Sequence, residues 1–235
     1  IGLGIPAEPL FRSSYTVKFD ADDMTAIMDG DKYADNADIS LEIPLEFDIK
    51  EYQAKFENSE ININKIKIEF IGSTTLKDDI TMNMDIRTNT MIINDLMRLL
   101  PEKLKESLLG GMKIDGKVLI LSHIEGVYND TQMPVINADV TLTDGYLEME
   151  DALPFPLTAV NTTIHTDLDL NGKSDVYVKS LRARMNNTSV AASGNVKDVL
   201  DKMFCDLRVK ADVDFDDVKH FMPEEMVAQG QVKAD

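Results

Sequence analysis

The chain has 235 residues, 43% of them hydrophobic, so it can bury a sizeable core in one or two domains. Its 42 acidic and 24 basic side chains give a net charge of −18, which repels phosphate backbones and argues against nucleic acid as a partner. The single cysteine, Cys205, lies on the apolar side of an alternating run, where we expect a small buried hydrophobic residue.

Apolar and polar residues alternate along most of the chain. A period of two is typical of antiparallel strands with one apolar and one solvated face, and about a dozen such strands are expected. In chain order, the apolar positions are Tyr15, Val17 and Phe19; Leu41, Ile43, Leu45, Phe47 and Ile49; Ile66, Ile68 and Phe70; Met82, Met84 and Ile86; Ile136, Ala138, Val140 and Leu142; Ile164, Thr166, Leu168 and Leu170; and Cys205, Leu207, Val209, Ala211, Val213 and Phe215.

Helical patterns are few and short. A weak helical turn is expected over residues 22–28. Asn94 is a suitable N-cap for an amphipathic stretch that Pro101 breaks or kinks and that Gly110 and Gly111 end. A counterpart is expected from Asp216 or Asp217, past Pro223, to about residue 229.

Glycine and proline mark the turns between the strands. Asp144-Gly145 and Asn171-Gly172 are typical of tight hairpins, because these residues accept a positive φ. The stretch 153–157, with Pro154 and Pro156, is expected to be a loop.

Two stretches of the chain, 85–104 and 206–226, resemble each other at a spacing of about 122 residues. They read DIRTNTMIINDLMRLLPEKL and DLRVKADVDFDDVKHFMPEEM, and each predicts a strand followed by a short helix. The interpretation is a single elongated β-repeat piece of a longer chain, with approximate units 1–104 and 105–226 and with 227–235 beginning a further unit.

The strands outnumber the helices that are available to cover their apolar faces. We therefore expect a mainly β fold: a long, strongly curved antiparallel sheet with a few short helices, forming either a groove or an elongated sandwich. The 13 methionines and the lack of tryptophan suit an acyl-chain ligand, although plain core methionine is the simpler explanation. Predicted groove-lining residues are Leu41, Ile43, Leu45, Phe47, Met82, Met84, Ile86, Ile136, Val140, Leu142, Leu168, Leu170, Leu207, Val209, Val213 and Phe215.

Catalytic and metal-binding patterns are weak. Asp167, Asp169, Asn171 and Gly172 match half of a calcium loop, but position twelve is Val178 where a glutamate is required. His123, His165 and His220 are far apart in sequence, and His165 is expected on the polar face of its strand. The acidic pairs have no tryptophan platform beside them, which disfavours a carbohydrate-processing enzyme. We predict no catalytic residues, no metal and no cofactor.

The chain from residue 99 to 235 resembles the AsmA-like family of Gram-negative envelope proteins, through the spacing of several segments. The family has no catalytic residues. The resemblance implies an inner-membrane helix outside this piece, a periplasmic β-groove and, by similarity to chorein-type bridge proteins, lipids that slide along the groove. The segments are 99–104 (LLPEKL), 113–118 (KIDGKV), 144–146 (DGY), 153–157 (LPFPL), 181–184 (LRAR), 193–196 (SGNV) and 222–223 (MP), with 15–20 (YTVKFD) as a weaker match.

The leading hypothesis is a non-enzymatic periplasmic protein whose groove binds or conducts phospholipid or another acyl lipid between the inner and outer membranes. The alternative is a closed β-sandwich, structural or adhesin-like, with no ligand. A partner sheet over the apolar strand faces distinguishes the two. No run of the chain approaches the roughly 20 apolar residues of a membrane-spanning helix, so any anchor is expected outside this piece.

Overall fold

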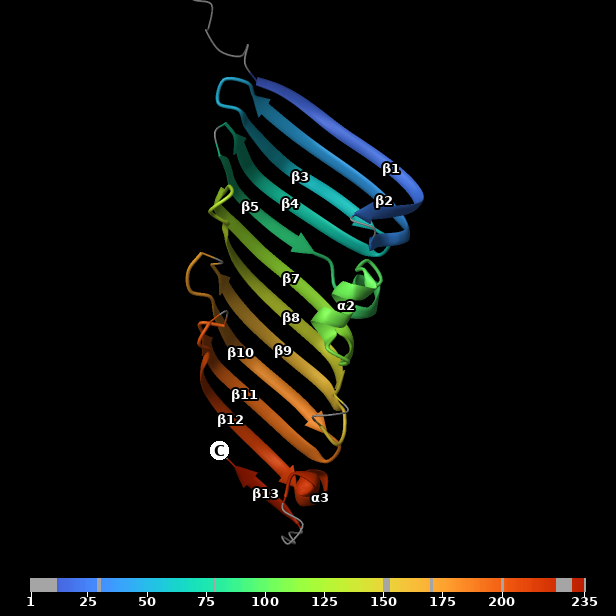
Figure 1. Cartoon of the computed structure of the whole chain (residues 1–235), viewed down its shortest axis with the longest axis vertical. Coiled ribbons are helices and arrows are strands. Elements are labelled where there is room, and N and C mark those ends of the chain that lie inside the picture. The colour runs from blue at the N-terminus through green and yellow to red at the C-terminus, as the bar shows by residue number, and fades with distance from the viewer. Residues whose placement is uncertain are drawn as a thin grey trace, which may run out of the picture.

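The computed structural model describes residues 12–28, 31–77, 79–149, 153–169, 171–199, 201–222 and 230–234. Over these residues thirteen strands form one antiparallel sheet, in which neighbouring strands are nearly all neighbours in sequence (Figure 1). The strands are β1 (Arg12–Met28), β2 (Asp31–Asp48), β3 (Gln53–Ile63), β4 (Ile66–Leu76), β5 (Ile80–Thr88), β6 (Met91–Ile92), β7 (Lys113–Tyr128), β8 (Val135–Glu148), β9 (Leu157–Leu168), β10 (Asp175–Met185), β11 (Thr188–Lys197), β12 (Phe204–Asp214) and β13 (Gln231–Ala234).

The helices occupy the connections at one end of the strands. α1 (Ile93–Met97) and α2 (Glu102–Leu109) join β6 to β7, and α3 (Phe215–Val218), with a 3₁₀ turn over Lys219–Phe221, follows β12. Both connections therefore lie on the same long edge of the sheet (Figure 1).

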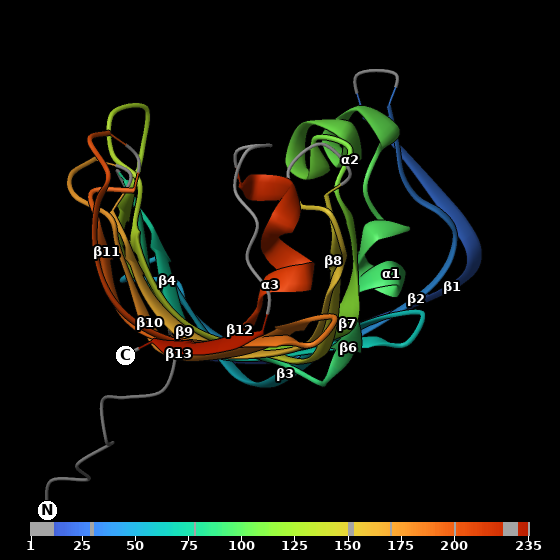
Figure 2. The same ribbon diagram turned by 90° about the horizontal axis from the view of Figure 1, so that it is seen from below.

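The sheet curves strongly about its long axis and leaves a groove that is not closed into a barrel. Figure 2 looks along this axis and shows a U-shaped section, with α3 inside the U and α2 at one rim. No second sheet covers the strands within the part of the chain described, so of the two expected architectures the structure has the groove.

The strand pattern is confirmed, but residues 22–28 form a strand and not the expected helical turn. β1 continues to Met28 through register shifts at Ala21/Met24 and Met24/Ala26. Asp23 has a φ of 52° there, and its N–H donates to Asp38 Oδ1 at 3.2 Å. These bulges interrupt the period of two, which is why the stretch did not read as a strand.

Asp144-Gly145 is not a hairpin turn. Asp144 has the positive φ that its residue type suggested, 53°, but β8 continues past it to Glu148 with a register shift between Leu142 and Gly145. The dipeptide is a bulge inside a strand. Asn171-Gly172 does lie between two strands, β9 and β10, although the connection runs from 169 to 174 and is longer than a tight hairpin.

The expected helix after Asn94 is two helices. α1 begins directly where β6 ends, so Ile92 and not Asn94 is its N-cap, and no side chain caps it. Pro101 is the N-cap of α2, and Gly110 ends α2 in the left-handed conformation at φ 53°. The counterpart near the C-terminus begins at Phe215, and its expected continuation over 223–229 lies outside the described residues.

The main buried cluster lies where α1 meets the sheet. Ile66, Met91, Ile93 and Val118 are its buried members. Because α1 packs over part of β4 and β7, this section of the sheet has the second layer that a core requires. Partly buried residues around it are Ile68, Leu96, Met97, Leu99, Ile114, Ile120, Val140 and Leu142.

Candidate functional site

Strand pairing collects the apolar residues on one face of the sheet. Residues that pair directly in an antiparallel sheet point to the same face. One row crosses β8 to β12 through Val140, Ile164, Val178, Gly194 and Leu207. A parallel row crosses β2 to β9 through Leu45, Phe56, Gly72, Met84, Ile124, Ile136 and Leu168.

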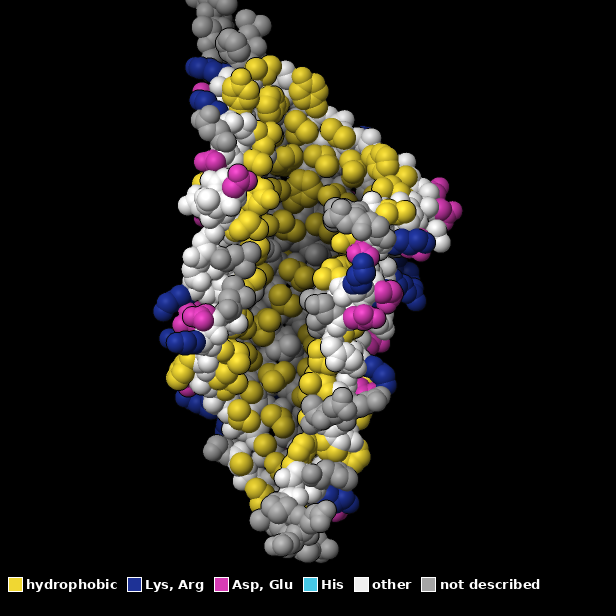
Figure 3. Space-filling model, in the orientation of Figure 1, with side chains coloured by type: hydrophobic (Ala, Val, Ile, Leu, Met, Phe, Trp, Pro, Cys, Tyr) yellow, Lys and Arg dark blue, Asp and Glu magenta, His cyan; other side chains and the backbone are white. Residues whose placement is uncertain are grey.

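This apolar face is the concave one. Val118 and Ile120 belong to it and contact the α1 cluster, on the side where the helices lie. Figure 3 looks into the groove and shows hydrophobic side chains along its length, with charged side chains gathered at the two rims. The groove is therefore an apolar trough with polar borders.

Most of the predicted lining residues lie on the concave face. Leu170 falls outside the described residues, and Phe215 begins α3 instead of ending a strand. Pairing and the period of two place these residues on the concave face: Leu41, Ile43, Leu45, Phe47, Met82, Met84, Ile86, Ile136, Val140, Leu142, Leu168, Leu207, Val209 and Val213.

Apolar side chains on this face remain accessible. Leu207 is 42% exposed, Val209 46% and Val17 47%. In a closed sandwich a second sheet would cover this face and bury these side chains. Cys205 shares this face and is also exposed, which corrects the expectation that it is buried. Its pairing with Val196 fits the predicted face, but among the described residues no second sheet covers β12. An apolar face that remains this accessible over the described residues is a candidate binding surface.

Two glycines allow neighbouring strands to approach closely. Gly72 has a φ of 146° and Gly194 a φ of 143°. A Cβ on Gly72 would lie 2.2 Å from Asn83 O, and one on Gly194 would lie 2.2 Å from Asp206 O. Because both contacts are to backbone, no larger residue fits without opening the strand pair.

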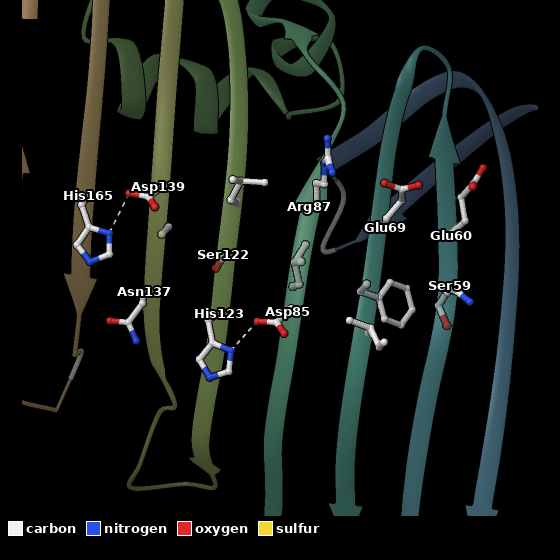
Figure 4. A pocket seen from close by; sticks show the side chains of 16 residues that line it. Ser59, Glu60, Glu69, Asp85, Arg87, Ser122, His123, Asn137, Asp139 and His165 are labelled. Atoms are coloured by element: carbon white, nitrogen blue, oxygen red, sulfur yellow. Dashed lines mark hydrogen bonds and ion pairs between the residues drawn. The ribbon is translucent and has the colours of Figure 1, made fainter. Parts of the chain in front are cut away.

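The convex face carries the charged side chains that alternate with the apolar ones. A shallow depression crosses its centre, where His123 Nδ1 lies 2.7 Å from Asp85 Oδ1 and His165 Nδ1 lies 3.0 Å from Asp139 Oδ1. Figure 4 shows both pairs projecting from adjacent strands on the face away from the helices.

One member of each pair has a shifted pKa. The hydrogen bond to the Asp85 carboxylate raises the pKa of His123 above its ordinary value. Lys179 Nζ, 2.5 Å from Asp139 Oδ1, lowers the pKa of Asp139, and His165 adds to that effect. The sequence did not reveal these pairs, because they form across strands 26 to 40 positions apart, and their register is not visible in any local spacing.

The depression lacks the parts of a nucleophilic site. Ser122 precedes His123 on β7 and therefore points to the opposite face of the sheet. Among the described residues, no three His, Cys, Asp or Glu side chains are grouped closely enough to hold a metal ion. Within the same residues, every helix is too short or too polar to cross a membrane.

The candidate calcium loop is a turn that is satisfied internally. Asp169 Oδ1 accepts from the N–H of Asn171 at 2.9 Å, while the Asn171 amide donates to Met133 O at 2.7 Å. The fully buried Ser174 hydroxyl donates to Asp169 O at 3.1 Å. These bonds fix Asp169, Asn171 and Ser174 in the connection between β9 and β10.

Comparisons of the chain with protein-family models, with curated proteins and with solved structures give no match.

Proposed function

We propose that the concave groove binds the acyl chains of lipids and that the chain acts, without catalysis, as a section of a lipid conduit in the cell envelope. The observation that carries this proposal is the apolar concave face, which remains partly accessible because, among the described residues, no second sheet covers it. Its placement in the periplasm, between inner and outer membranes, rests on the resemblance of residues 99–235 to AsmA-like proteins.

The chemistry of the lining supports an acyl ligand over a polar one. Leu, Ile, Val and Met dominate the rows that cross the groove, whereas pairing places charged side chains of the same strands on the convex face. Figure 3 shows further charged side chains at the rims of the groove. Burying a methylene contributes about 0.8 kcal/mol, so ten methylenes contribute about 8 kcal/mol before the cost of ordering the chain.

The alternative, a ligand-free structural or adhesin-like module, requires something else to cover the same face. Among the described residues, α1 covers the section around Ile93, whereas Leu207 and Val209 lie beyond that cluster and are exposed. The accessible rows therefore favour the lipid proposal.

Native mass spectrometry with organic extraction of the purified chain tests the proposal directly. We expect phospholipid or fatty acid to co-purify at near-stoichiometric amounts. A folded, thermally stable protein that carries no lipid, and that takes up none from phosphatidylcholine vesicles, would contradict the proposal and favour the structural module.

A matched pair of variants separates the apolar face from net charge. Val209→Asp puts a carboxylate on the concave face of β12, and Ser193→Asp puts one on the convex face of the adjacent strand β11. Both add one negative charge at an exposed position. We expect Val209→Asp to abolish lipid retention and Ser193→Asp to leave it unchanged. Equal lipid content in both variants would contradict a role for the concave face.

A further inference from the structure

The two halves of the sheet repeat each other strand by strand. β3 (Gln53–Ile63) and β10 (Asp175–Met185) have equal lengths and lie 122 positions apart, as do the starts of β4 and β11. The bulge between Phe56 and Ser59 recurs between Val178 and Leu181 at the same spacing. Gly72 and Gly194 are also 122 positions apart. They have similar φ values, and at both positions the neighbouring strand approaches equally closely.

The helical connection recurs with the strands. α1 follows β6 and α3 follows β12, and in both cases the next strand, β7 or β13, pairs back on the strand before the helix. Met91 pairs with Val118 in the first half, and Val213, 122 positions later, pairs with Val232 in the second. In both halves of the sheet, therefore, a strand leads into a helix on the concave side, and the next strand pairs back on the strand before the helix.

Both connections are fixed in place. Ile93 of α1 is buried against Ile66 and Val118, and Leu99 O accepts from the N–H of Ala34 at 3.1 Å. Asp217 of α3 is fully buried, and its carboxylate accepts from Asn186 Nδ2 at 2.6 Å and from the N–H of Thr188 at 2.7 Å. These contacts hold each helix over the groove from the same edge (Figure 2).

We propose that the two helical connections divide the groove into successive bays, each of which holds one diacyl lipid, so that this chain carries two lipid molecules. This inference rests on the proposed function. The first bay is the concave face of β1–β5, and the second is that of β7–β12.

The length of each bay fits one lipid. Neighbouring strands lie about 4.8 Å apart, measured across the strands, and the strands slant to the groove axis (Figure 1). The five strands of the first bay therefore span at least roughly 24 Å along the groove, and the six of the second at least roughly 29 Å. One acyl chain crosses half a bilayer core in about 15 Å, and two laid end to end need about 30 Å. Each bay is therefore long enough for one lipid with its two chains side by side.

Phe56 and Val178 are equivalent positions for testing the bays separately. Each lies on the concave face, at the same bulge, in the middle of its own bay. Phe56→Asp adds a charge to the first bay only, and Val178→Asp to the second only. Ser193→Asp, on the convex face, is the control for added charge.

The experiment counts phosphatidylcholine molecules on the chain by native mass spectrometry after saturation with vesicles. We expect two on the parent and on Ser193→Asp, one on each concave variant, and none on the double variant. The proposal of two separate bays would be overturned if the parent bound one lipid or more than two lipids. Loss of both lipids from a single variant would overturn it as well. A parent that binds none would instead overturn the proposed function.

The parent count does not depend on any variant folding. The unfolding transition of each variant is followed by circular dichroism before loading. Phe56→Asn and Val178→Asn replace either aspartate variant that lacks a cooperative transition, with the same expected counts.

Discussion

A single methyl group on Gly194 should destabilise the whole sheet. Its Cβ would lie 2.2 Å from Asp206 O and 2.9 Å from the Leu207 Cα, and both neighbours are backbone atoms that cannot rotate away. Holding alanine at a φ near 143° adds conformational strain. The strain costs about 1–2 kcal/mol and the overpacking about 1–3 kcal/mol, which together destabilise the fold by about 2–5 kcal/mol.

The expected shift in melting temperature follows from chain length. An unfolding entropy of about 2.1 cal/mol/K per residue amounts to about 0.5 kcal/mol/K for this chain, so Gly194→Ala should lower Tm by about 4–10 °C. Gly72→Ala should have an effect of the same size, because its Cβ meets the equivalent backbone atoms. Thermal unfolding followed by circular dichroism measures both.

Gly110→Ala is the control, because it adds backbone strain without a steric clash. It has a φ of 53° at the end of α2, and a Cβ there would meet nothing within 4 Å. Gly110→Ala should therefore cost only about 1–2 kcal/mol, or about 2–4 °C in Tm. If Gly194→Ala melts at the same temperature as Gly110→Ala, the close approach of β11 to β12 is refuted.

Three further predictions concern single side chains. Burial raises the pKa of Asp217, but hydrogen bonds, led by the one from Asn186, outweigh burial and leave the pKa below its ordinary value. The ionised carboxylate should therefore stabilise the fold at neutral pH, and this stabilisation should disappear as acid titrates the folded carboxylate. Asp217→Asn should flatten the decline in Tm between pH 7 and pH 3, and an unchanged decline would contradict this. The raised pKa of His123 should stabilise the fold below the ordinary histidine pKa of about 6.5, an effect lost as pH rises through the folded value; an NMR titration should give a midpoint above the ordinary value that Asp85→Asn lowers. Cys205 should react with a maleimide in the folded protein and more slowly after lipid loading, whereas full protection of the lipid-free protein would refute its exposure.

The alternation of side chains was sufficient to predict the strands and which residues share the apolar face, because both are local properties of a half-buried sheet. Irregular backbone was harder to predict. Asp23 and Asp144 adopt a positive φ inside strands, and nothing in their own sequence distinguishes such a bulge from the end of a strand. Asn94 is a good capping residue by type, but the pairing of β6 with β7 sets where α1 begins.

Properties that depend on register were not predictable from the sequence. The Asp85–His123 pair exists because β5 and β7 align these residues across the intervening helical connection. Cys205 lies on the expected face, and its exposure follows because no second sheet covers β12 within the described part of the chain, and not from its own residue type. The choice between groove and sandwich likewise required knowing whether the sheet folds over onto itself, which alternation does not encode.

The pairing of nearly every strand with its neighbour in sequence also has a consequence for how the chain folds. Low contact order lets hairpins form early and lets the sheet grow outward from any of them, since no distant segment must arrive first. Unfolding should then proceed by fraying, with amide hydrogens of β1 and β12 exchanging faster than those of β7 and β8. Such a chain can acquire structure progressively as it emerges, one strand at a time.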